Sequence, residues 1–561
     1  MSAGGIPRTG GQVLVDQLRI HGVDTAFCVP GESYLATLDA LYGARNAIRM
    51  VTCRQEGGVT NMAEAYGKIT GKPGIAFVTR GPGACNGSIG VHTAMQDSTP
   101  MVIFIGQVAR EQEYREAFQE VDYHQFYGAL CKWVVQIDSA DRIPELVSQA
   151  FHRAMSGRPG PVAVALPEDM QRDLTEVEDA APYQIARPGA APKDMTAMQA
   201  MLAAAKKPLM ILGGAGWSQA ACADILAYAE ANNLPTCASF RCQDLFDNAH
   251  KNYAGELGTS ISPALSKRMA EADLLIVVGA RMGEMTTSGY KLLKLPKPAQ
   301  TLVHVYMDPG ELGRVYRPDL PIAASMESFA EAARALPPVK SPAWGAWAEA
   351  ARQDYLENLK PTRAMPGALD MHKVMDHLNE VLPDDAIIVN DAGNFSGWPQ
   401  RFYRYRRFRT QVAPTSGAMG YAIPAAVAAS LVQPNSPVVA FVGDGGALMT
   451  GQELATAVQH GSTPIILVVN NNLYGTIRMH QDRDFPGHDY SVALKNPDFA
   501  KWAESFGCHA EVVARTEDFA PAFERARKAG RAALLELRVD PEMITTRTTL
   551  TAIREASQAR K

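Results

Sequence analysis

An internal repeat constrains the fold of this chain more than any other feature: residues 76–106 match residues 440–470 without a gap. The two stretches, AFVTRGPGACNGSIGVHTAMQDSTPMVIFIG and AFVGDGGALMTGQELATAVQHGSTPIILVVN, are identical at eight of 31 positions. Each has the pattern of a strand, a glycine-containing loop, a helix, a Ser-Thr-Pro turn and a second strand. Any two strand–helix–strand units look alike in outline, but a Ser-Thr-Pro at a fixed offset favours common ancestry of two domains.

The rest of the chain continues this alternation of helical patterns with short β-rich runs, which is typical of parallel sheets covered by helices. Strands are expected at 74–79, 100–106, 208–214, 274–280, 437–443 and 464–470. Two stretches rich in proline, alanine and glycine, 179–192 and 336–345, indicate linkers. We therefore predict an α/β protein of three doubly wound parallel-sheet domains, 1–185, 190–340 and 355–561, which suits a length of 561 residues.

Composition excludes several classes of partner. A net charge of −5 gives no general attraction for nucleic acid or anionic membranes. No apolar run approaches the about 20 residues that span a bilayer, and the start, MSAGGIPRTGG, lacks the apolar core of a secretory signal. Eight cysteines are scattered without a Cys-x-x-Cys pair, so neither a disulfide framework nor a zinc site is indicated. We expect a cytoplasmic protein that acts on small molecules.

The two copies of the repeat differ where their strands end. The third domain has Asp444 in the glycine loop where the first domain has Arg80, and its second strand runs into three asparagines, 470–472, where the first copy has 106–108. Ligands of open parallel sheets bind beyond the carboxyl ends of the strands. If the two strands are neighbours, the side chains of Asp444 and Asn471 converge above the sheet.

This oxygen-rich set suits a magnesium ion. One carboxylate, one amide oxygen and a main-chain carbonyl are too few to enclose Mg²⁺, which completes its octahedron with water and phosphate oxygens. The glycines that follow Asp444 let main-chain N–H groups approach a phosphate, and a helix expected to begin near Leu448 points its positive end there. We interpret the region as a magnesium-bridged diphosphate site; the alternative is a polar turn that caps a helix.

Two further glycine loops follow expected strands of the middle domain. They are GGAGWS (213–218) and GARMGEMTTSG (279–289). Neither is a G-x-G-x-x-G fingerprint, and no acid clearly occupies the position that would read a ribose. Each could bind a nucleotide or only pack a tight turn between a strand and a helix.

Taken together, these motifs resemble the thiamine-diphosphate enzymes, and among them the acetolactate (acetohydroxyacid) synthase large subunits. The resemblance covers nearly the whole chain, in the order pyrimidine-binding, central Rossmann-like and diphosphate-binding domain. Besides Gly443-Asp444-Gly445 and Asn470-Asn471, it rests on RQEGGVTNMAEAYGKITGKPG (54–74), GPGACN (81–86), DSTPMVIFIGQV (97–108), AFQEVD (117–122), GRPGPVAVALPEDM (157–170) and SGAMGYAIPAAVAA (416–429).

The resemblance implies a role for each residue that matches a family motif. Asp444, the Asn471 side chain and the Leu473 carbonyl are implied to bind Mg²⁺, which holds the diphosphate of thiamine diphosphate. Met419 matches the bulky residue that props the cofactor into its bent shape, with the Gly417 carbonyl near the aminopyrimidine. The remaining implied cofactor contacts are Gly393, Asn394, Phe395, Gly445, Gly446 and Tyr474.

Glu56 matches the glutamate that shares a proton with the pyrimidine ring. Without the resemblance it would be a first-turn glutamate favoured by the helix dipole. A carboxyl in a desolvated pocket can hand its proton to the ring nitrogen. In this family the first domain of one subunit faces the third domain of its partner, so the resemblance implies a homodimer or homotetramer with the active site at the interface. It does not indicate which of the two, nor a regulatory subunit.

Other residues are implied on the substrate side. Phe118 and Gln119 match a family pair that lines the substrate side of the site. Glu32 lies where acetolactate synthases usually have glycine and some related decarboxylases have a carboxylate. His480 replaces the tryptophan that selects the acceptor in those synthases. YAGELG (253–258) stands in place of the usual flavin-contacting run, so the middle domain is expected to bind FAD, another nucleotide or nothing.

We therefore predict an enzyme that decarboxylates a small 2-oxo acid, as acetolactate synthases do, and adds the pyruvate-derived enamine to a second carbonyl. The alternative is a lyase or carboligase of 2-hydroxy ketones or 2-hydroxyacyl thioesters that releases no CO₂. A non-catalytic binding subunit is disfavoured, because Glu56 and the Asp444–Asn471 pair are both present.

Overall fold

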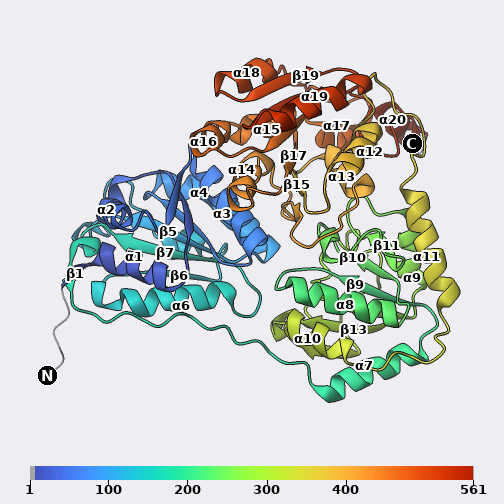
Figure 1. The fold of residues 1–561 in the computed structure, drawn as a ribbon, viewed down its shortest axis with the longest axis horizontal. Helices are drawn as coiled ribbons and strands as arrows, with labels where there is room; N and C mark the ends of the chain where they lie inside the picture. Colours follow the sequence, from blue (N-terminus) through green and yellow to red (C-terminus); the bar gives the residue numbers. More distant parts are fainter. Residues whose placement is uncertain (1–6, 560–561) are drawn as a thin grey trace.

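A computed structural model describes residues 7–559 as three α/β domains arranged around a common centre (Figure 1). Each domain contains one six-stranded parallel sheet. The α/β class and the three parallel sheets predicted from the sequence are confirmed. Within the described residues, no helix is long and apolar enough to cross a membrane.

The first domain has the strand order β3-β2-β4-β5-β7-β6. These strands are β2 (Thr25–Cys28), β3 (Arg49–Thr52), β4 (Gly74–Val78), β5 (Met101–Gln107), β6 (Trp133–Gln136) and β7 (Pro161–Pro167), with a small antiparallel pair, β1 (Arg8–Thr9) and β8 (Leu174–Thr175). The helices are α1 (Gly10–Ile20), α2 (Leu35–Gly43), α3 (Glu56–Thr70), α4 (Pro82–Asp97), α5 (Tyr123–Tyr127) and α6 (Ile143–Met155). Strands β4, β5 and β7 are buried throughout, as expected for a parallel sheet covered on both faces.

The middle domain has the order β11-β10-β9-β12-β13-β14. Its strands are β9 (Pro208–Leu212), β10 (Thr236–Ala238), β11 (Tyr253–Glu256), β12 (Leu274–Val278), β13 (Thr301–Tyr306) and β14 (Leu320–Ala323). Its helices are α7 (Pro192–Ala204), α8 (Gln219–Ala231), α9 (Pro263–Glu271) and α10 (Met326–Arg334), and α11 (Gly345–Asn358) leads on toward the third domain.

The third domain has the order β16-β15-β17-β18-β20-β19. Its strands are β15 (Ile387–Asn390), β16 (Gln411–Val412), β17 (Val438–Gly443), β18 (Ile465–Asn470), β19 (His509–Val513) and β20 (Ala533–Arg538). Its helices are α12 (Met371–Val381), α13 (Gly397–Phe402), α14 (Ala422–Val432), α15 (Asp444–Thr450), α16 (Glu453–His460), α17 (Gly475–Asp484), α18 (Phe499–Ser505), α19 (Thr516–Lys528) and α20 (Leu550–Gln558).

The first and third domains share one continuous hydrophobic core, formed where α3 packs on α14. Helix α14 is apolar almost all round, AIPAAVAASLV, which is expected of a helix enclosed on every side. The two strand–helix–strand copies therefore lie in domains that are packed against each other within the same chain (Figure 1).

One local expectation was wrong. The helix after β17 begins at Asp444 itself rather than near Leu448, and it ends at Thr450 before α16 starts at Glu453. The glycines of GDGG suggested a loop, but an acidic residue in the first turn is stabilised by the helix dipole. Asp444 is therefore held on a helix and not on a mobile turn.

Candidate functional site

Asp444 lies at the carboxyl end of β17, next to the neighbouring strand β18. Only 2% of the residue is exposed. The Asn496 side-chain amide donates hydrogen bonds to Asp444 Oδ2 at 2.8 Å and to Asn470 Oδ1 at 2.9 Å. Burial raises the pKa of Asp444. Strands β17 and β18 are neighbours, as this convergence requires, and Asn496, which the sequence did not single out, lies between Asp444 and Asn470. The approach of the Asn471 side chain to Asp444 stays a prediction.

The other two predicted metal ligands lie in the turn that follows β18. Asn471 Oδ1 accepts a hydrogen bond from the Leu473 N–H at 3.1 Å, and Leu473 forms an isolated bridge with Ala493. No group of three His, Cys, Asp or Glu side chains suited to a metal occurs within residues 7–559. Asp444 and Asn471 would give such an ion one carboxylate and one amide oxygen, a set that Mg²⁺ completes with water and phosphate oxygens.

The backbone around Asp444 passes very close to aromatic rings. A β-carbon at Gly445 would lie 2.5 Å from a ring carbon of Tyr474, and one at Gly443 would lie 2.9 Å from a ring carbon of Phe395. Only glycine permits this approach. Gly393, Phe395, Gly445 and Tyr474 thereby meet at the N-terminus of α15, where main-chain N–H groups can face an anion. This chemistry fits a diphosphate with a divalent cation.

Asn394 lies in the same region but is tied to α17. Its backbone N–H donates to Thr476 Oγ1 at 3.1 Å, and its side-chain oxygen accepts from that hydroxyl at 3.0 Å. Its side-chain amide contacts the Met479 sulfur at 3.3 Å. Asn394 thus links the diphosphate end to the helix that carries His480, whose Nδ1 is buried without a partner among the described residues.

Residues 413–421, which carry Gly417 and Met419, receive contacts from all three domains. From the third domain, Asp391 accepts the Gly420 N–H at 2.9 Å and Thr450 donates to the Gly420 carbonyl at 2.6 Å. Burial raises the pKa of Asp391 to about 6. Two hydrogen bonds from within the third domain therefore fix the segment close to Gly417, which has a left-handed φ of 72°.

The contacts from the other two domains also end on this segment. Lys68 Nζ donates to the Ala413 carbonyl at 2.6 Å, and Asp97 accepts the Thr415 N–H at 2.8 Å. Arg241 of the middle domain donates to the carbonyl of Pro414. None of Lys68, Asp97 and Arg241 was singled out from the sequence. Their partners lie more than 150 residues away, so no local signal could have revealed them.

Glu56 is the first residue of α3, and its position is well defined. The Gln55 side chain caps the helix by accepting the N–H groups of Gly57 and Gly58. Glu56 Oε2 accepts a hydrogen bond from the Asn86 side chain at 3.0 Å, and Oε1 lies 3.2 Å from where a β-carbon of Gly83 would be. The carboxyl group therefore lies against the first two turns of α4, which follows β4 after a loop of three residues.

The loop between β4 and α4, Thr79–Gly81, gathers the other predicted substrate-side residues. The Arg80 guanidinium bonds Glu32 at 2.9 Å and donates to the Phe118 carbonyl at 3.2 Å. A β-carbon at Gly81 would lie 2.7 Å from the Gln119 carbonyl oxygen. Glu32 and the Phe118–Gln119 pair thus come from two separate segments to the end of β4, next to Glu56.

The two glycine loops of the middle domain border one large cavity. It has a volume of about 1050 Å³ and lies between the three domains, with 214–218 and 280–286 in its wall. Its cationic lining residues are Lys68, Arg158, Arg187, Arg241, Arg281, Arg314 and Arg409. The same wall carries five acidic residues: Asp97, Asp244, Glu284, Glu311 and Glu327. Seven cations minus five anions leave two formal positive charges. A modest excess of positive charge suits an anionic ligand.

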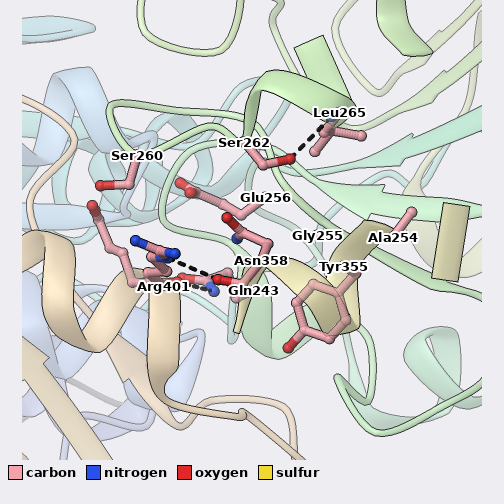
Figure 2. A pocket seen from close by; sticks show the side chains of 11 residues that line it. Gln243, Ala254, Gly255, Glu256, Ser260, Ser262, Leu265, Tyr355, Asn358 and Arg401 are labelled. Carbon is pink, nitrogen blue, oxygen red and sulfur yellow. Dashed lines mark hydrogen bonds between the residues drawn. The ribbon is translucent and has the colours of Figure 1, made fainter. Parts of the chain in front are cut away.

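The segment 253–258 does not contribute to that cavity wall in the described part of the chain. Ala254, Gly255 and Glu256 instead border a separate cavity of about 20 Å³, which Gln400 and Arg401 also line (Figure 2). Burial raises the pKa of Glu256 to about 7. The segment 253–258 thus borders a space of about one water molecule.

Three family models match the chain, one in each domain. They are the thiamine pyrophosphate enzyme N-terminal TPP binding domain at residues 8–126, the central domain at 195–333 and the C-terminal TPP binding domain at 391–537. These ranges contain Glu56 in the first match and Asp444 with the asparagine cluster in the third.

Curated relatives match over almost the entire length. The acetolactate synthase large subunit of Lactococcus lactis subsp. lactis is 31% identical, covering 89% of this chain and 87% of the relative. That of Parasynechococcus marenigrum is 33% identical, with 89% and 82% covered. The acetolactate synthase isozyme 2 large subunit of Escherichia coli is 29% identical, with 95% of both chains covered.

Proposed function

We propose that this chain, which belongs to the thiamine pyrophosphate enzyme family, decarboxylates a small 2-oxo acid and joins the remaining acyl fragment to a second carbonyl compound. The family establishes a thiamine diphosphate-dependent enzyme that acts on C–C bonds and is similar to acetolactate synthases. The observation that carries the proposal further is the presence of both site ends: Glu56 at a strand-end loop of the first domain, and Asp444 with its asparagines in the third.

The residues present fit the cofactor. Thiamine diphosphate, when bound, supplies the electron sink that decarboxylation requires. Asp444, Asn471 and the Leu473 carbonyl would hold Mg²⁺, and the glycine backbone beside Tyr474 and Phe395 would face the diphosphate. Glu56 would exchange a proton with the pyrimidine ring nitrogen. Gly417 and Met419 would orient the ring, because their segment is fixed by Asp391 and Thr450.

We propose that the working enzyme is a homodimer or homotetramer with the active site between subunits. Supporting this, apolar side chains near both site ends are exposed in the single chain: Phe118 (74%), Ile477 (53%), Leu448 (46%), Met449 (45%) and Met419 (37%). Large apolar side chains that are exposed in the single chain are candidates for burial in a subunit interface. Sedimentation of the purified protein tests this; a monomer that is fully active would contradict it.

Two further assignments accompany the proposal. Any nucleotide, FAD included, would occupy the large cationic cavity between the domains; the visible spectrum and mass of material released from purified protein test for it. A cytoplasmic location fits eight cysteines that are all free thiols in the structure.

The decisive experiment is a screen of 2-oxo acids with added thiamine diphosphate and Mg²⁺, with CO₂ release measured and products identified by mass spectrometry. CO₂ release from at least one small 2-oxo acid, together with a C–C coupled product, is expected. No CO₂ from any of them, combined with cleavage of a 2-hydroxy ketone or 2-hydroxyacyl thioester, would replace the proposal with the non-decarboxylating alternative.

A further inference from the structure

We infer that the enzyme's acceptor is an uncharged aldehyde or ketone rather than a second 2-oxo acid, because the charged groups that Arg80 gathers at the substrate side are net negative. This inference rests on the proposed function and names the substrate class left open there. We call Glu32, Arg80 and Glu168 the strand-end cluster, since they follow β2, β4 and β7 at the carboxyl edge of the first sheet.

Arg80 offers a substrate carboxylate little uncompensated positive charge in this arrangement, although two of its five N–H donors stay unused. Its side chain is 10% exposed, and its three nitrogens are committed to Glu32 at 2.9 Å, to Glu168 at 3.1 Å and to the Phe118 carbonyl at 3.2 Å. A guanidinium that already bonds two carboxylates has its charge more than balanced. The strand-end cluster therefore carries one net negative charge.

Glu32 is the member of the cluster that faces open space. Its side chain is 64% exposed, against 33% for Glu168. Glu32 begins the short η1 helix (Glu32–Tyr34), and the preceding Gly31 lies against Thr79, the residue that follows β4. Gly83, in the first turn of α4, lies close to both Thr79 and Glu56. Thr79 thus lies between the surroundings of Glu32 and those of Glu56, which puts the Glu32 charge in the neighbourhood of a substrate at Glu56.

The segment that carries Phe118 and Gln119 adds to this charge. Between Tyr114 and Asp122 it has three acidic residues, Glu116, Glu120 and Asp122, and one basic residue, Arg115. Tyr114, Glu116 and Gln119 have left-handed φ values of 62°, 53° and 66°. Glu120 fixes this unusual backbone by accepting the N–H groups of Tyr114 and Ala117. Non-glycine residues held in this conformation cluster at functional sites.

A negative environment affects donor and acceptor differently. In the overall reaction, a donor R–CO–COO⁻, an acceptor R′–CHO and one proton give R–CO–CH(OH)–R′ and CO₂. The C–C bond to the donor carboxylate breaks, a new bond forms to the acceptor carbonyl carbon, and the acceptor oxygen takes up the proton. The donor loses its charge as CO₂, so repulsion in its bound state is relieved during the reaction.

An acceptor that carries its own carboxylate keeps its charge through the whole step. Repulsion from Glu32 and from the segment 114–122 is then not relieved, and binding of such an acceptor is weakened throughout. An aldehyde or ketone of similar size has no charge to repel. The structure therefore assigns Glu32 as a residue that determines acceptor specificity.

The test measures the ratio of two products, the one coupled to acetaldehyde and the one coupled to a second 2-oxo acid. The donor is the 2-oxo acid that gives the fastest CO₂ release in the screen, and it is supplied alone or with acetaldehyde at equal concentration. We expect the wild-type enzyme to form mainly the aldehyde-coupled product. Glu32→Gln removes the charge at nearly constant shape, and should raise kcat/KM for the 2-oxo acid acceptor relative to acetaldehyde by about tenfold, which corresponds to about 1.4 kcal/mol.

The matched control is Glu111→Gln in η2 (Arg110–Gln112), an exposed glutamate outside the strand-end cluster. It makes the same charge change and should leave the ratio unchanged. A wild-type enzyme that prefers the 2-oxo acid acceptor, or a Glu32→Gln ratio equal to that of the control, overturns this inference while the proposed function stands. No CO₂ release from any donor overturns both.

Discussion

The two copies of the strand–helix–strand unit are built alike and carry opposite charges at the same position. In the first domain Arg80 follows β4, and its cation is surrounded by two carboxylates and a carbonyl. In the third domain Asp444 follows β17, and its anion is met by an amide donor and a helix N-terminus. One scaffold thus supplies two strand-end loops of different chemistry, one suited to a substrate and one to a diphosphate with its metal.

The helices of the two copies also differ. In the first domain α4 runs unbroken for 16 residues, whereas in the third α15 ends at Thr450 and α16 begins at Glu453. The break brings the buried Glu453 carboxylate to the N–H groups of Arg54 and Gln55, just before Glu56. The third-domain copy has therefore acquired a contact that fixes the start of the first domain's helix.

The largest effect is expected at Glu56, which lies beside the first-domain copy. It tests whether Glu56 exchanges a proton with the pyrimidine ring of the cofactor. Glu56→Gln should lower turnover by about 100-fold or more, the range for a lost acid–base group, while thiamine diphosphate binding stays largely intact. Steady-state rates and a cofactor titration by fluorescence measure the two quantities. Normal turnover in this variant would remove the proton-transfer role.

The next largest effect concerns the copy in the third domain. Asp444→Ala should raise the half-saturating concentrations of Mg²⁺ and thiamine diphosphate together, by at least about tenfold, since even outer-shell groups cost that much at metal sites. Activity titrations with each ligand at saturating concentrations of the other provide the measurement. Unchanged requirements would contradict the metal assignment.

A pH titration sharpens the same point without a mutation. Burial raises the pKa of Asp444, and only its deprotonated form binds a cation. As pH falls below this raised pKa, protons compete with the metal, so half-saturating Mg²⁺ should rise by up to about tenfold per pH unit. A Mg²⁺ requirement that stays flat as the pH is lowered would argue that another group binds the ion.

The smallest effect is expected when the first copy loses its cation. Arg80→Met should leave the Mg²⁺ requirement unchanged and lower the free energy of unfolding by about 1 kcal/mol, because the carboxylates left behind remain partly solvated. Urea denaturation of this variant measures the loss, with Arg80→Lys as a control that keeps the charge without the planar fork. A changed Mg²⁺ requirement would mean that the two loops are not functionally separate.

The sequence predicted those parts of the fold that depend on local pattern. Each expected strand is present within two residues, because continuous apolar runs bounded by glycine and proline leave little alternative. The start of α15 was misplaced because GDGG lacks the side chains that make a helix visible in sequence. The domain boundaries and the roles assigned to the site residues stay predictions.

The site was predictable only as far as its motifs reach. Asp444 and the asparagines were found because they sit at the ends of adjacent strands. Asn496 was missed because it lies in an irregular stretch and contributes a lone amide. Glu168 lies in the quoted stretch 157–170 but was given no role, because its contact is with Arg80, 88 residues away.

The attachment of residues 413–421 to all three domains affects how the protein responds to local damage. A lesion in the middle domain, remote from any reacting atom, loosens Arg241 and with it the carbonyl of Pro414. The same short segment also carries Gly417 and Met419, the proposed contacts of the cofactor ring. We therefore expect such damage to weaken retention of thiamine diphosphate before the chain unfolds, so cofactor retention would report on the integrity of all three domains.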